Sequence, residues 1–469
     1  MIEDDTIAAI ATAAGVGGVG IVRVSGPRAI AIVADVLGIA NHKLDRRVRV
    51  GWARDADSQP LDQVLAFAMR APASFTGEDV AELHGHGGAH NLQRLLDAVL
   101  ARGARVAEPG EFTRRAVEHG KLDLIRAEAL LEVIHAGSER AWRLAQANLN
   151  GRLGEVAAEL ETCALGILAE VEGRIDFPEE GIAAPESAAI EHEIATLAER
   201  CRQLANGFRH GRALSRGITV ALVGAVNVGK SSLLNALVGK ERALVASAPG
   251  TTRDYLEVSD VWDGVAVTLV DTAGTRPTAD AIEARGIELG EQRVASADVV
   301  IVVNDGVAPW DDGSRFGDRA LVVRSKSDLR DDELATGTTG TTGAAGSAGS
   351  TGTTGAAGGA RPAREPVLAT SATTGQGLEA LERAVLALAG VADREGSEDA
   401  FVTTVRQQAT AAAAGAAFAA ALDAWRLTRV PEVIALELRQ GVQALAQLRG
   451  VEVGDRVLDE VFARFCIGK

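Results

Sequence analysis

The chain has 469 residues, and its 48 lysines and arginines against 64 aspartates and glutamates give a net charge of −16. Hydrophobic residues make up 47% of the sequence, which excludes a wholly disordered protein. The acidic balance argues against a protein that holds nucleic acid by bulk positive charge, so an RNA contact would require a local basic patch or a partner. At roughly 100–200 residues per domain, the length predicts about three domains.

The cysteines and the start of the chain predict a soluble, cytoplasmic protein. Cys163, Cys201 and Cys466 lie too far apart in sequence for metal-ligand spacing, and an odd number fits no disulfide framework. The acidic start Met1–Asp5 differs from the basic start of a secretory signal. The longest weakly apolar stretch, Ala409–Leu422, is shorter than the roughly 18 residues that a membrane-spanning helix requires.

Hydrophobic periodicity divides the chain into blocks. Residues 1–120 alternate short apolar runs with glycine and proline, which predicts an α+β domain. Apolar residues then recur at spacings of three and four, which predicts helices over 121–216 and again over 391–469. Because the ends of an inserted domain lie close together, the economical interpretation is one discontinuous helical domain. Two unrelated helical domains are the alternative.

The block over 217–390 is predicted to be an inserted α/β domain. Its apolar runs alternate with helix-like segments, as in a parallel sheet whose strands are joined by helices. The predicted strands are Ile218–Val223, Val265–Val270, Val299–Val303, Leu321–Val323 and Val367–Ala369. Within this block, Ala335–Ala360 contains only alanine, glycine, serine and threonine, which predicts a flexible surface insert without a chemical role.

A phosphate-binding motif follows the first predicted strand of this block. Gly224–Ser231 matches G-x-x-x-x-G-K-[ST] and precedes a helical run. The glycines let backbone N–H groups and a helix N-terminus approach a polyphosphate, Lys230 adds a cation, and Ser231 adds an oxygen ligand for Mg²⁺. The strand-loop-helix setting supports a nucleoside triphosphate site.

Four further elements complete a GTPase set in chain order. Thr251-Thr252 would bind Mg²⁺ through Thr252, and Asp271–Gly274 would order the metal's water shell and sense the γ-phosphate. Ser325–Asp328 resembles the guanine-reading N-K-x-D loop, and Ser371-Ala372 follows it. The residues predicted to contact GTP are Asn227, Val228, Gly229, Lys230, Ser231, Ser232, Ala246, Ser247, Ala248, Pro249, Gly250, Thr251, Thr252, Asp271, Thr272, Ala273, Gly274, Ser325, Lys326, Asp328, Ser371 and Ala372.

One residue of the base-reading loop departs from the usual pattern. Ser325 stands where N-K-x-D has asparagine, while Asp328 keeps the carboxylate that accepts hydrogen bonds from guanine. Losing one neutral hydrogen bond costs roughly 0.5–1.5 kcal/mol, which is less than leaving the guanine donors unpaired. We therefore expect guanine preference with weakened affinity.

The machinery for hydrolysis also differs from that of many small GTPases. Thr275 occupies the position that often holds a water-orienting glutamine. A second, monovalent cation beside the phosphates would supply positive charge instead, and Asn227 and the Ala246–Thr252 segment are predicted to hold it. Glu283 is a candidate to position water, and the alternative is a solvated helix residue.

Motifs near both ends resemble those of a known family, the bacterial tRNA-modification GTPases called MnmE or TrmE. These motifs are Asp5–Thr12, Arg23–Pro27, Ser74–Asp79, His84–Gly88, Pro109–Thr113, Gly120–Leu124, Ile175–Pro178 and Phe465–Lys469. The resemblance covers essentially the whole chain except the 335–360 tract. It implies an N-terminal tetrahydrofolate-binding and dimerisation domain, a discontinuous helical domain and an inserted, Ras-like P-loop GTPase domain.

The resemblance also implies an activity. Members of the family form homodimers and, with two subunits of the FAD-dependent partner MnmG, heterotetramers. Together they add an aminomethyl or carboxymethylaminomethyl group to carbon five of the wobble uridine of certain tRNAs, with 5-formyl- or methylene-tetrahydrofolate as the one-carbon source. GTP hydrolysis is stimulated by K⁺, requires two G domains to meet, and uses a glutamate at the position of Glu283. No DNA or membrane partner is implied.

Family positions extend to folate. Arg23, Glu82, Lys121 and Lys469 match the folate-contacting positions, where a carboxylate suits the pterin edge and cations suit the glutamyl carboxylates. Cys466 matches the cysteine of the family's C-terminal motif. Its side chain could act as a nucleophile near the one-carbon unit, or it could be a small buried apolar residue.

Some residues carry a weaker signal. His84 and His86 have the spacing of metal ligands, but without a further cysteine or histidine cluster a role in a turn is favoured. Gln407 follows Arg406 where the family often has histidine.

Two rival functions fit parts of the pattern. An RNA-binding regulatory GTPase of the ribosome-assembly type would usually carry a basic RNA-binding domain, and this chain is acidic. A folate-dependent one-carbon transferase, in which the G domain only regulates, is the other alternative.

Overall fold

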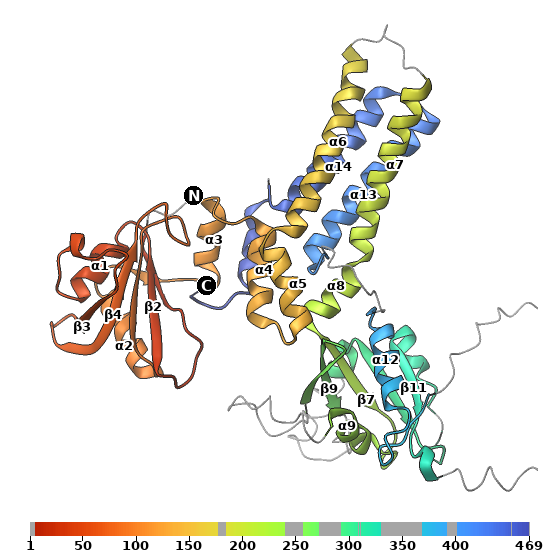
Figure 1. Cartoon of the computed structure of the whole chain (residues 1–469), viewed down its shortest axis with the longest axis horizontal. Helices are drawn as coiled ribbons and strands as arrows, with labels where there is room; N and C mark the ends of the chain where they lie inside the picture. Colours follow the sequence, from red (N-terminus) through yellow and green to blue (C-terminus); the bar gives the residue numbers. More distant parts are fainter. Residues whose placement is uncertain are drawn as a thin grey trace, which may run out of the picture. The chain divides into compact units, whose positions relative to one another are not determined.

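A computed structural model describes residues 5–176, 184–239, 257–271, 292–307, 309, 311–329, 368–391, 401–451 and 453–468 (Figure 1). The chain divides into two compact units. The first contains Met1–His135, Ala145–Asn206 and Thr404–Lys469, and the second contains Ala136–Leu144 and Gly207–Thr403. No helix within the described ranges is long and apolar enough to cross a membrane.

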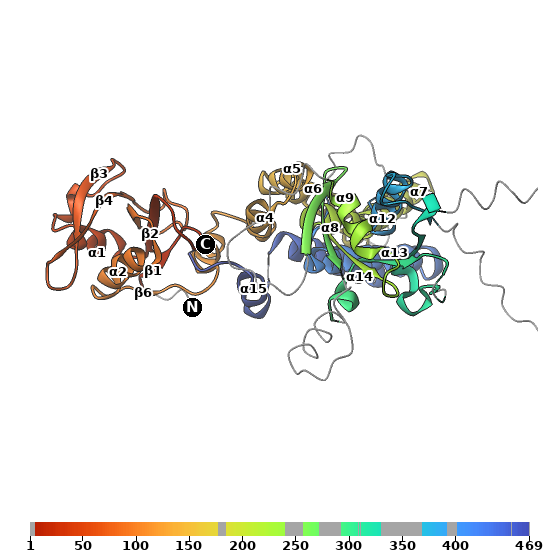
Figure 2. The same cartoon turned by 90° about the horizontal axis from the view of Figure 1, so that it is seen from below.

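The N-terminal part of the first unit is a six-stranded sheet with helices α1 (Ala29–Val36) and α2 (Ala89–Leu100) packed on one face (Figure 1 and Figure 2). Its strands run in the order β3-β4-β5-β2-β1-β6, and only β1 and β6 pair in parallel. Alternate residues such as Val22 and Leu83 pack with α1 and α2 in the core. The elements are β1 (Ile7–Ile10), β2 (Val19–Ser25), α1 (Ala29–Val36), β3 (Arg49–Arg54), β4 (Pro60–Met69), β5 (Val80–His86), α2 (Ala89–Leu100), β6 (Arg105–Val106) and α3 (Glu111–Glu118).

The rest of the first unit is helical. Its core joins Leu160 and Ile194, which precede the segment Gly207–Thr403 in sequence, to Phe418 and Leu438, which follow it. Helix α13 packs against α7 and α14, and α14 packs against α6. One discontinuous helical domain is therefore confirmed, and two unrelated helical domains are wrong. The helices of this region are α4 (Leu124–His135), α6 (Arg152–Asp176), α7 (Ala184–Asn206), α13 (Val405–Leu427), α14 (Pro431–Arg449) and α15 (Asp455–Phe462). Helix α5 (Glu139–Leu149) begins in the second unit and ends in the first.

A buried carboxylate on α4 holds the point where the chain re-enters this domain. Glu128 Oε1 and Oε2 accept hydrogen bonds from Arg406 at 3.0 and 2.7 Å. Its oxygens also accept from the Thr404 hydroxyl at 3.1 Å and from the Gln407 amide at 2.7 Å. Thr404 and Gln407 form the capping box that starts α13. Gln407, which stands where the family often has histidine, therefore has a structural role. Its side-chain amide donates to Glu128 and also takes part in the cap of α13.

The second unit contains a six-stranded sheet in the order β12-β11-β10-β7-β9-β8. All of its neighbouring strands are parallel except β8 and β9. The inserted α/β domain is thus confirmed. Its elements are α8 (Phe208–Arg216), β7 (Ile218–Val223), α9 (Lys230–Val238), β8 (Glu257–Trp262), β9 (Val265–Asp271), β10 (Val299–Asn304), β11 (Ala320–Arg324), β12 (Leu368–Ala369) and α12 (Leu378–Leu388).

Strand β8 is not among the strands predicted from the sequence. It lies at the sheet edge, and only Asp260 and Trp262 of its residues are buried, so it contains no apolar run. The Trp262 indole donates to Asp260 Oδ2 at 3.2 Å, so the aspartate is part of the packing. The Ala335–Ala360 tract lies outside the described residues.

Replacing Glu128 with alanine should destabilise the helical domain, because the Arg406 guanidinium, only 14% exposed, would lose its carboxylate partner. Removal of one partner of a buried ion pair costs about 3–5 kcal/mol, so the urea midpoint of unfolding should fall clearly. Glu199→Ala is the matched control, since it breaks an exposed, solvent-screened pair with Arg202 and should leave the midpoint nearly unchanged. Equal midpoints for the two variants would show that the contact of Glu128 with Arg406 does not stabilise the helical domain.

Candidate functional site

The phosphate loop links the carboxyl end of β7 to helix α9. Gly224 has φ +149°, and a Cβ at this position would lie 2.3 Å from the Val303 carbonyl oxygen of β10, so only glycine fits. Gly229 is left-handed and immediately precedes Lys230, the first residue of α9. The loop therefore presents backbone N–H groups and a helix N-terminus, the arrangement that binds phosphate.

Two oxygen donors meet beside the start of α9. The Ser231 hydroxyl donates to Asp271 Oδ2 at 2.7 Å, and Asp271 is the buried last residue of β9. Because β9 pairs directly with β7, the sheet fixes this contact. A hydroxyl and a carboxylate are hard oxygen ligands of the kind that Mg²⁺ prefers, so this donor set fits the predicted metal.

Lys230 lies within the phosphate loop and is only 7% exposed. Its ammonium group donates to the Gly224 and Ala225 carbonyl oxygens at 3.0 and 2.8 Å. Burial lowers the pKa of Lys230, and the nearby Asp271 carboxylate opposes that shift. Phosphate oxygens beside this amine would favour its charged form.

The base-reading loop is attached to the phosphate loop by side chains. The buried Ser325 hydroxyl donates to the Val228 carbonyl oxygen at 2.5 Å and to the Asn304 carbonyl oxygen at 3.3 Å. The Lys326 ammonium group donates to the Asn227 carbonyl oxygen at 2.8 Å and pairs with Asp305 at 3.1 Å. The serine in place of asparagine thus still connects the two loops.

The remaining described residues of the set lie at the same edge of the sheet. Asp328 is half-buried in the short 3-10 turn Ser327–Leu329 that follows β11. The fully buried Ser371 accepts hydrogen bonds from the Thr373 and Thr374 backbone N–H groups. The Ser327 backbone N–H donates to the Thr370 carbonyl oxygen at 3.1 Å, which joins the two loops.

The sequence motifs do not single out Asn304, the last residue of β10, or Asp305, which follows it, although these residues support Ser325 and Lys326. Their position offered a signal. They follow an apolar strand that lies between the strands of the phosphate and base-reading loops, and the carboxyl ends of parallel strands meet at one edge.

Several predicted residues lie outside the described residues. They are Ala246, Ser247, Ala248, Pro249, Gly250, Thr251, Thr252, Thr272, Ala273, Gly274, Glu283 and Lys469. Of the other predicted GTP contacts, Asn227, Ser231 and Ser232 are exposed at the phosphate loop.

A second polar cluster lies on the N-terminal sheet. Arg23 and Glu82 are cross-strand neighbours on β2 and β5, and Arg23 Nε donates to Glu82 Oε1 at 2.8 Å. His84 Nε2 lies 2.8 Å from Glu82 Oε2. Burial alone would raise the pKa of Glu82, but hydrogen bonds from His84 and Arg23 outweigh it and hold the pKa below its usual value. Glu82 is thus an ionised hydrogen-bond acceptor.

The C-terminal segment packs against this cluster. Arg23 Nη1 donates to the Gly468 carbonyl oxygen at 3.4 Å, and Ile467 forms a bridge with Pro109. Cys466 is exposed, so its interpretation as a buried apolar residue is wrong. Lys121 is also exposed, and its ammonium group donates to the Pro72 carbonyl oxygen at 2.7 Å.

The two histidines lie in strand β5, so the favoured role in a turn is wrong. His84 contacts Glu82, and the His86 ring contacts Asp62 at 2.6 Å. Asp62 also accepts from Asn91 at 2.8 Å. Within the part of the chain that the structure describes, no group of three or more metal-ligating side chains is found.

Two family models match the chain and together span most of it. "GTP-binding protein TrmE N-terminus" matches residues 6–121, and "MnmE helical domain" matches residues 124–466. A tRNA modification GTPase MnmE of Synechococcus sp. is 43% identical over 100% of this chain and 99% of the relative. The chain belongs to the MnmE family of tRNA-modification GTPases.

Membership of the MnmE family confirms the resemblance and the prediction of a GTP hydrolase that binds GTP through its G domain. The MnmE protein of Geobacter metallireducens is 38% identical and matches over 100% of both chains. Among solved structures, the G domain of the T. maritima FeoB iron transporter is 24% identical and covers 37% of this chain and 98% of its own, with a TM-score of 0.23. A TM-score this low adds nothing to the assignment.

Ser325→Ala should weaken GDP binding, because the hydroxyl that joins the base-reading and phosphate loops would be lost. One hydrogen bond contributes about 0.5–1.5 kcal/mol, which corresponds to a roughly two- to tenfold rise in the dissociation constant, measured with a fluorescent GDP analogue. Ser327→Ala is the matched control, since its hydroxyl donates to Gln376 over a long 3.4 Å. An unchanged dissociation constant for Ser325→Ala would remove this role from Ser325.

Proposed function

We propose that the chain hydrolyses GTP to drive modification of the wobble uridine of certain tRNAs, together with MnmG and a tetrahydrofolate one-carbon unit. The observation that carries this proposal is the full-length match to tRNA modification GTPases, which extends through both helical blocks and the N-terminal domain. The acidic composition and the free cysteines are consistent with it, and we propose a cytoplasmic location. FAD would enter only with MnmG.

In the nucleotide site, the phosphate loop and Lys230 would bind the β- and γ-phosphates. Ser231 and Thr252 would hold Mg²⁺, with Asp271 ordering its waters, and the ion would neutralise charge that develops on the phosphates. Asp328 would accept hydrogen bonds from guanine, and Ser325, Lys326, Ser371 and Ala372 would position the loops around the base. The close attachment of both loops supports this division of roles.

Hydrolysis is proposed to require K⁺ and a second G domain. The backbone carbonyl of Asn227 already accepts from Lys326, so the exposed side-chain amide is the group available for a cation. Ala246, Ala248 and Thr251 would complete the K⁺ site, and Glu283 would orient water. The exposed position of Asn227 at the phosphate loop supports its part in this site.

The N-terminal domain is proposed to bind tetrahydrofolate through Arg23, Glu82, Lys121 and Lys469. The ionised Glu82 would accept from the pterin edge, and the cationic side chains would pair with the glutamyl carboxylates. The contact between Arg23 and Gly468 supports a site shared with the C-terminal segment. This segment would bring the exposed Cys466, the proposed nucleophile, to the one-carbon unit.

The same sheet face supports the proposed homodimer. Arg23 and Glu82 lie on the face opposite α1 and α2, as the alternation of core residues on β2 and β5 requires. Val50, Trp52 and Leu65 on this face are 67%, 52% and 44% exposed. Large apolar side chains gathered on one face are typical of a protein interface, so we propose that two N-terminal domains meet here, beside the folate residues.

Reconstitution tests the proposed function directly. The chain would be incubated with MnmG, FAD, GTP, methylene-tetrahydrofolate, an ammonium salt and unmodified tRNA, and wobble uridine would be analysed by mass spectrometry. We expect modification that requires every component and falls roughly 100-fold or more with Lys230→Ala, which removes the phosphate-binding cation. Folate binding by that variant should remain. Unmodified uridine in the complete mixture would overturn the proposal.

Replacing Na⁺ with K⁺ at equal ionic strength should raise the rate of GTP hydrolysis by the wild-type chain, because K⁺ would supply charge beside the phosphates. Asn227→Ala should reduce the difference between the two salts, as measured by phosphate release. Asn91→Ala, on the N-terminal domain, is the control and should respond to K⁺ like the wild type. Equal rates in both salts for the wild type would remove Asn227 from this role.

A further inference from the structure

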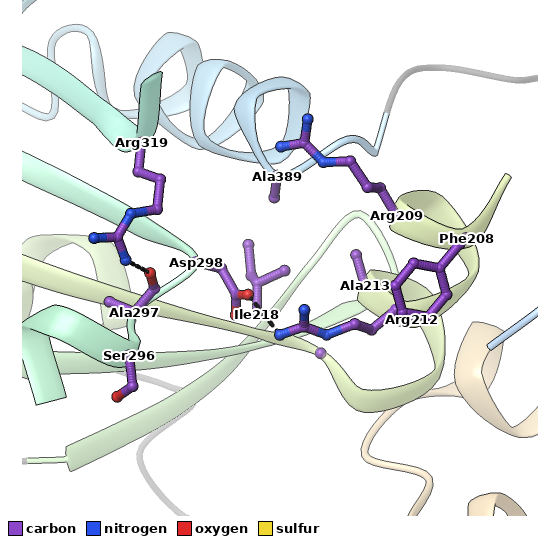
Figure 3. Close-up of a pocket in the computed structure, with 11 residues that line it drawn as sticks. Phe208, Arg209, Arg212, Ala213, Ile218, Ser296, Ala297, Asp298, Arg319 and Ala389 are labelled. Carbon is purple, nitrogen blue, oxygen red and sulfur yellow. Dashed lines mark hydrogen bonds and ion pairs between the residues drawn. The ribbon is translucent and has the colours of Figure 1, made fainter. Parts of the chain in front are cut away.

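A cavity of about 310 Å³ lies at the amino edge of the G-domain sheet, in the second unit (Figure 3). Ile218 begins β7, Asp298 precedes β10 and Arg319 precedes β11, so three parallel strands start at its wall. The phosphate loop follows the opposite, carboxyl end of β7. The cavity is therefore separate from the nucleotide site.

Arginines reach this cavity from different elements. Arg209 and Arg212 come from α8 and Arg319 comes from the segment before β11, and Figure 3 shows the three guanidinium groups around one opening. Asp298 is the single carboxylate among the described residues that line it. Three arginines and one aspartate leave a local charge of +2 in a chain whose net charge is −16.

Helix α8 extends the positive surface beyond the cavity. Its exposed residues are Arg209, Arg212 and Arg216, and it contains no acidic residue. The opposite side of α8 is buried, with His210 bonded to the Gly390 carbonyl oxygen at 3.2 Å. The arginine face is thus held in place by packing on the other side of the helix.

The arginines are fixed in position but retain donors. Arg212 pairs with Asp298 at 3.0 Å through Nη2, and Asp298 also accepts from the Thr219 backbone N–H at 2.9 Å. Arg319 uses Nη1 to donate to the Ala295 and Ala297 carbonyl oxygens. A guanidinium group has five N–H donors, so each of these side chains can also bind an anion.

We propose that this cavity and the arginine face of α8 bind a phosphate of the tRNA backbone. Guanidinium groups match phosphate geometry, and a phosphodiester is a monoanion that a site of charge +2 accommodates. The proposal rests on the proposed tRNA function. It supplies the local basic patch that an acidic chain needs in order to contact RNA.

Arg209→Glu is the decisive variant, because Arg209 is exposed and its recorded bond, to the Leu388 carbonyl oxygen, is long at 3.4 Å. Binding of fluorescein-labelled, unmodified tRNA would be followed by anisotropy at several salt concentrations. We expect affinity to fall roughly tenfold and the slope of log K against log salt to decrease by about 1, with Arg209→Lys close to wild type. GTP turnover should be unchanged in both variants.

Arg383→Glu is the matched control, since this exposed arginine on α12 of the same domain lies outside the cavity and should leave tRNA binding nearly unchanged. A second arm adds sodium phosphate at constant ionic strength, to separate tRNA from free phosphate as the ligand. Competition by phosphate without any effect of Arg209→Glu on tRNA would overturn the proposal, as would equal losses for Arg209→Glu and Arg383→Glu. If the wild type modifies tRNA in the reconstitution, either result refutes only this site.

Discussion

The buried carboxylate of Glu128 binds the chain at the residues where it returns from the G domain. A domain interrupted by a long insertion is stable only if both halves reach one core. Arg406 satisfies the charge of Glu128, while Thr404 and Gln407 use the same carboxylate and also cap α13. The same residues therefore start helix α13 and connect it to α4. The core of α6, α7, α13 and α14 then follows from ordinary apolar packing.

The nucleotide site depends on a different constraint, the shared edge of parallel strands. The phosphate loop, Asp271, Asn304 and the base-reading loop all lie at the carboxyl ends of adjacent strands. Ser325 and Lys326 then donate to backbone carbonyls of the phosphate loop. These bonds join the part that would read the base to the part that would hold the phosphates. The buried Ser325 hydroxyl makes one of these contacts, to the Val228 carbonyl oxygen.

The net charge of the molecule does not describe its local surfaces. A net charge of −16 excludes a broad basic surface, yet the exposed face of α8 consists of arginines. On the N-terminal sheet, the Arg23, Glu82 and His84 cluster likewise combines opposite charges that cancel in any total. Composition averages over the surface, whereas ligands respond to the few groups within reach, because salt screens charges beyond about 10 Å.

The sequence by itself determined the fold class, the GTPase motifs and the family. Apolar periodicity marks helices and buried strands wherever one side of an element faces a core, and the phosphate loop has a fixed spacing because its backbone wraps phosphate. The tertiary structure alone decided which polar residues pair. Edge strand β8 has no apolar run that would predict it. Apolar periodicity predicts the helix that carries Glu128 but not the burial of this carboxylate. Cys466 is exposed, which its place in a sequence motif does not reveal. Such pairings join residues far apart in the chain, such as Glu128 with Arg406 and Arg23 with Gly468. A local sequence pattern does not specify which distant residue a polar side chain will contact.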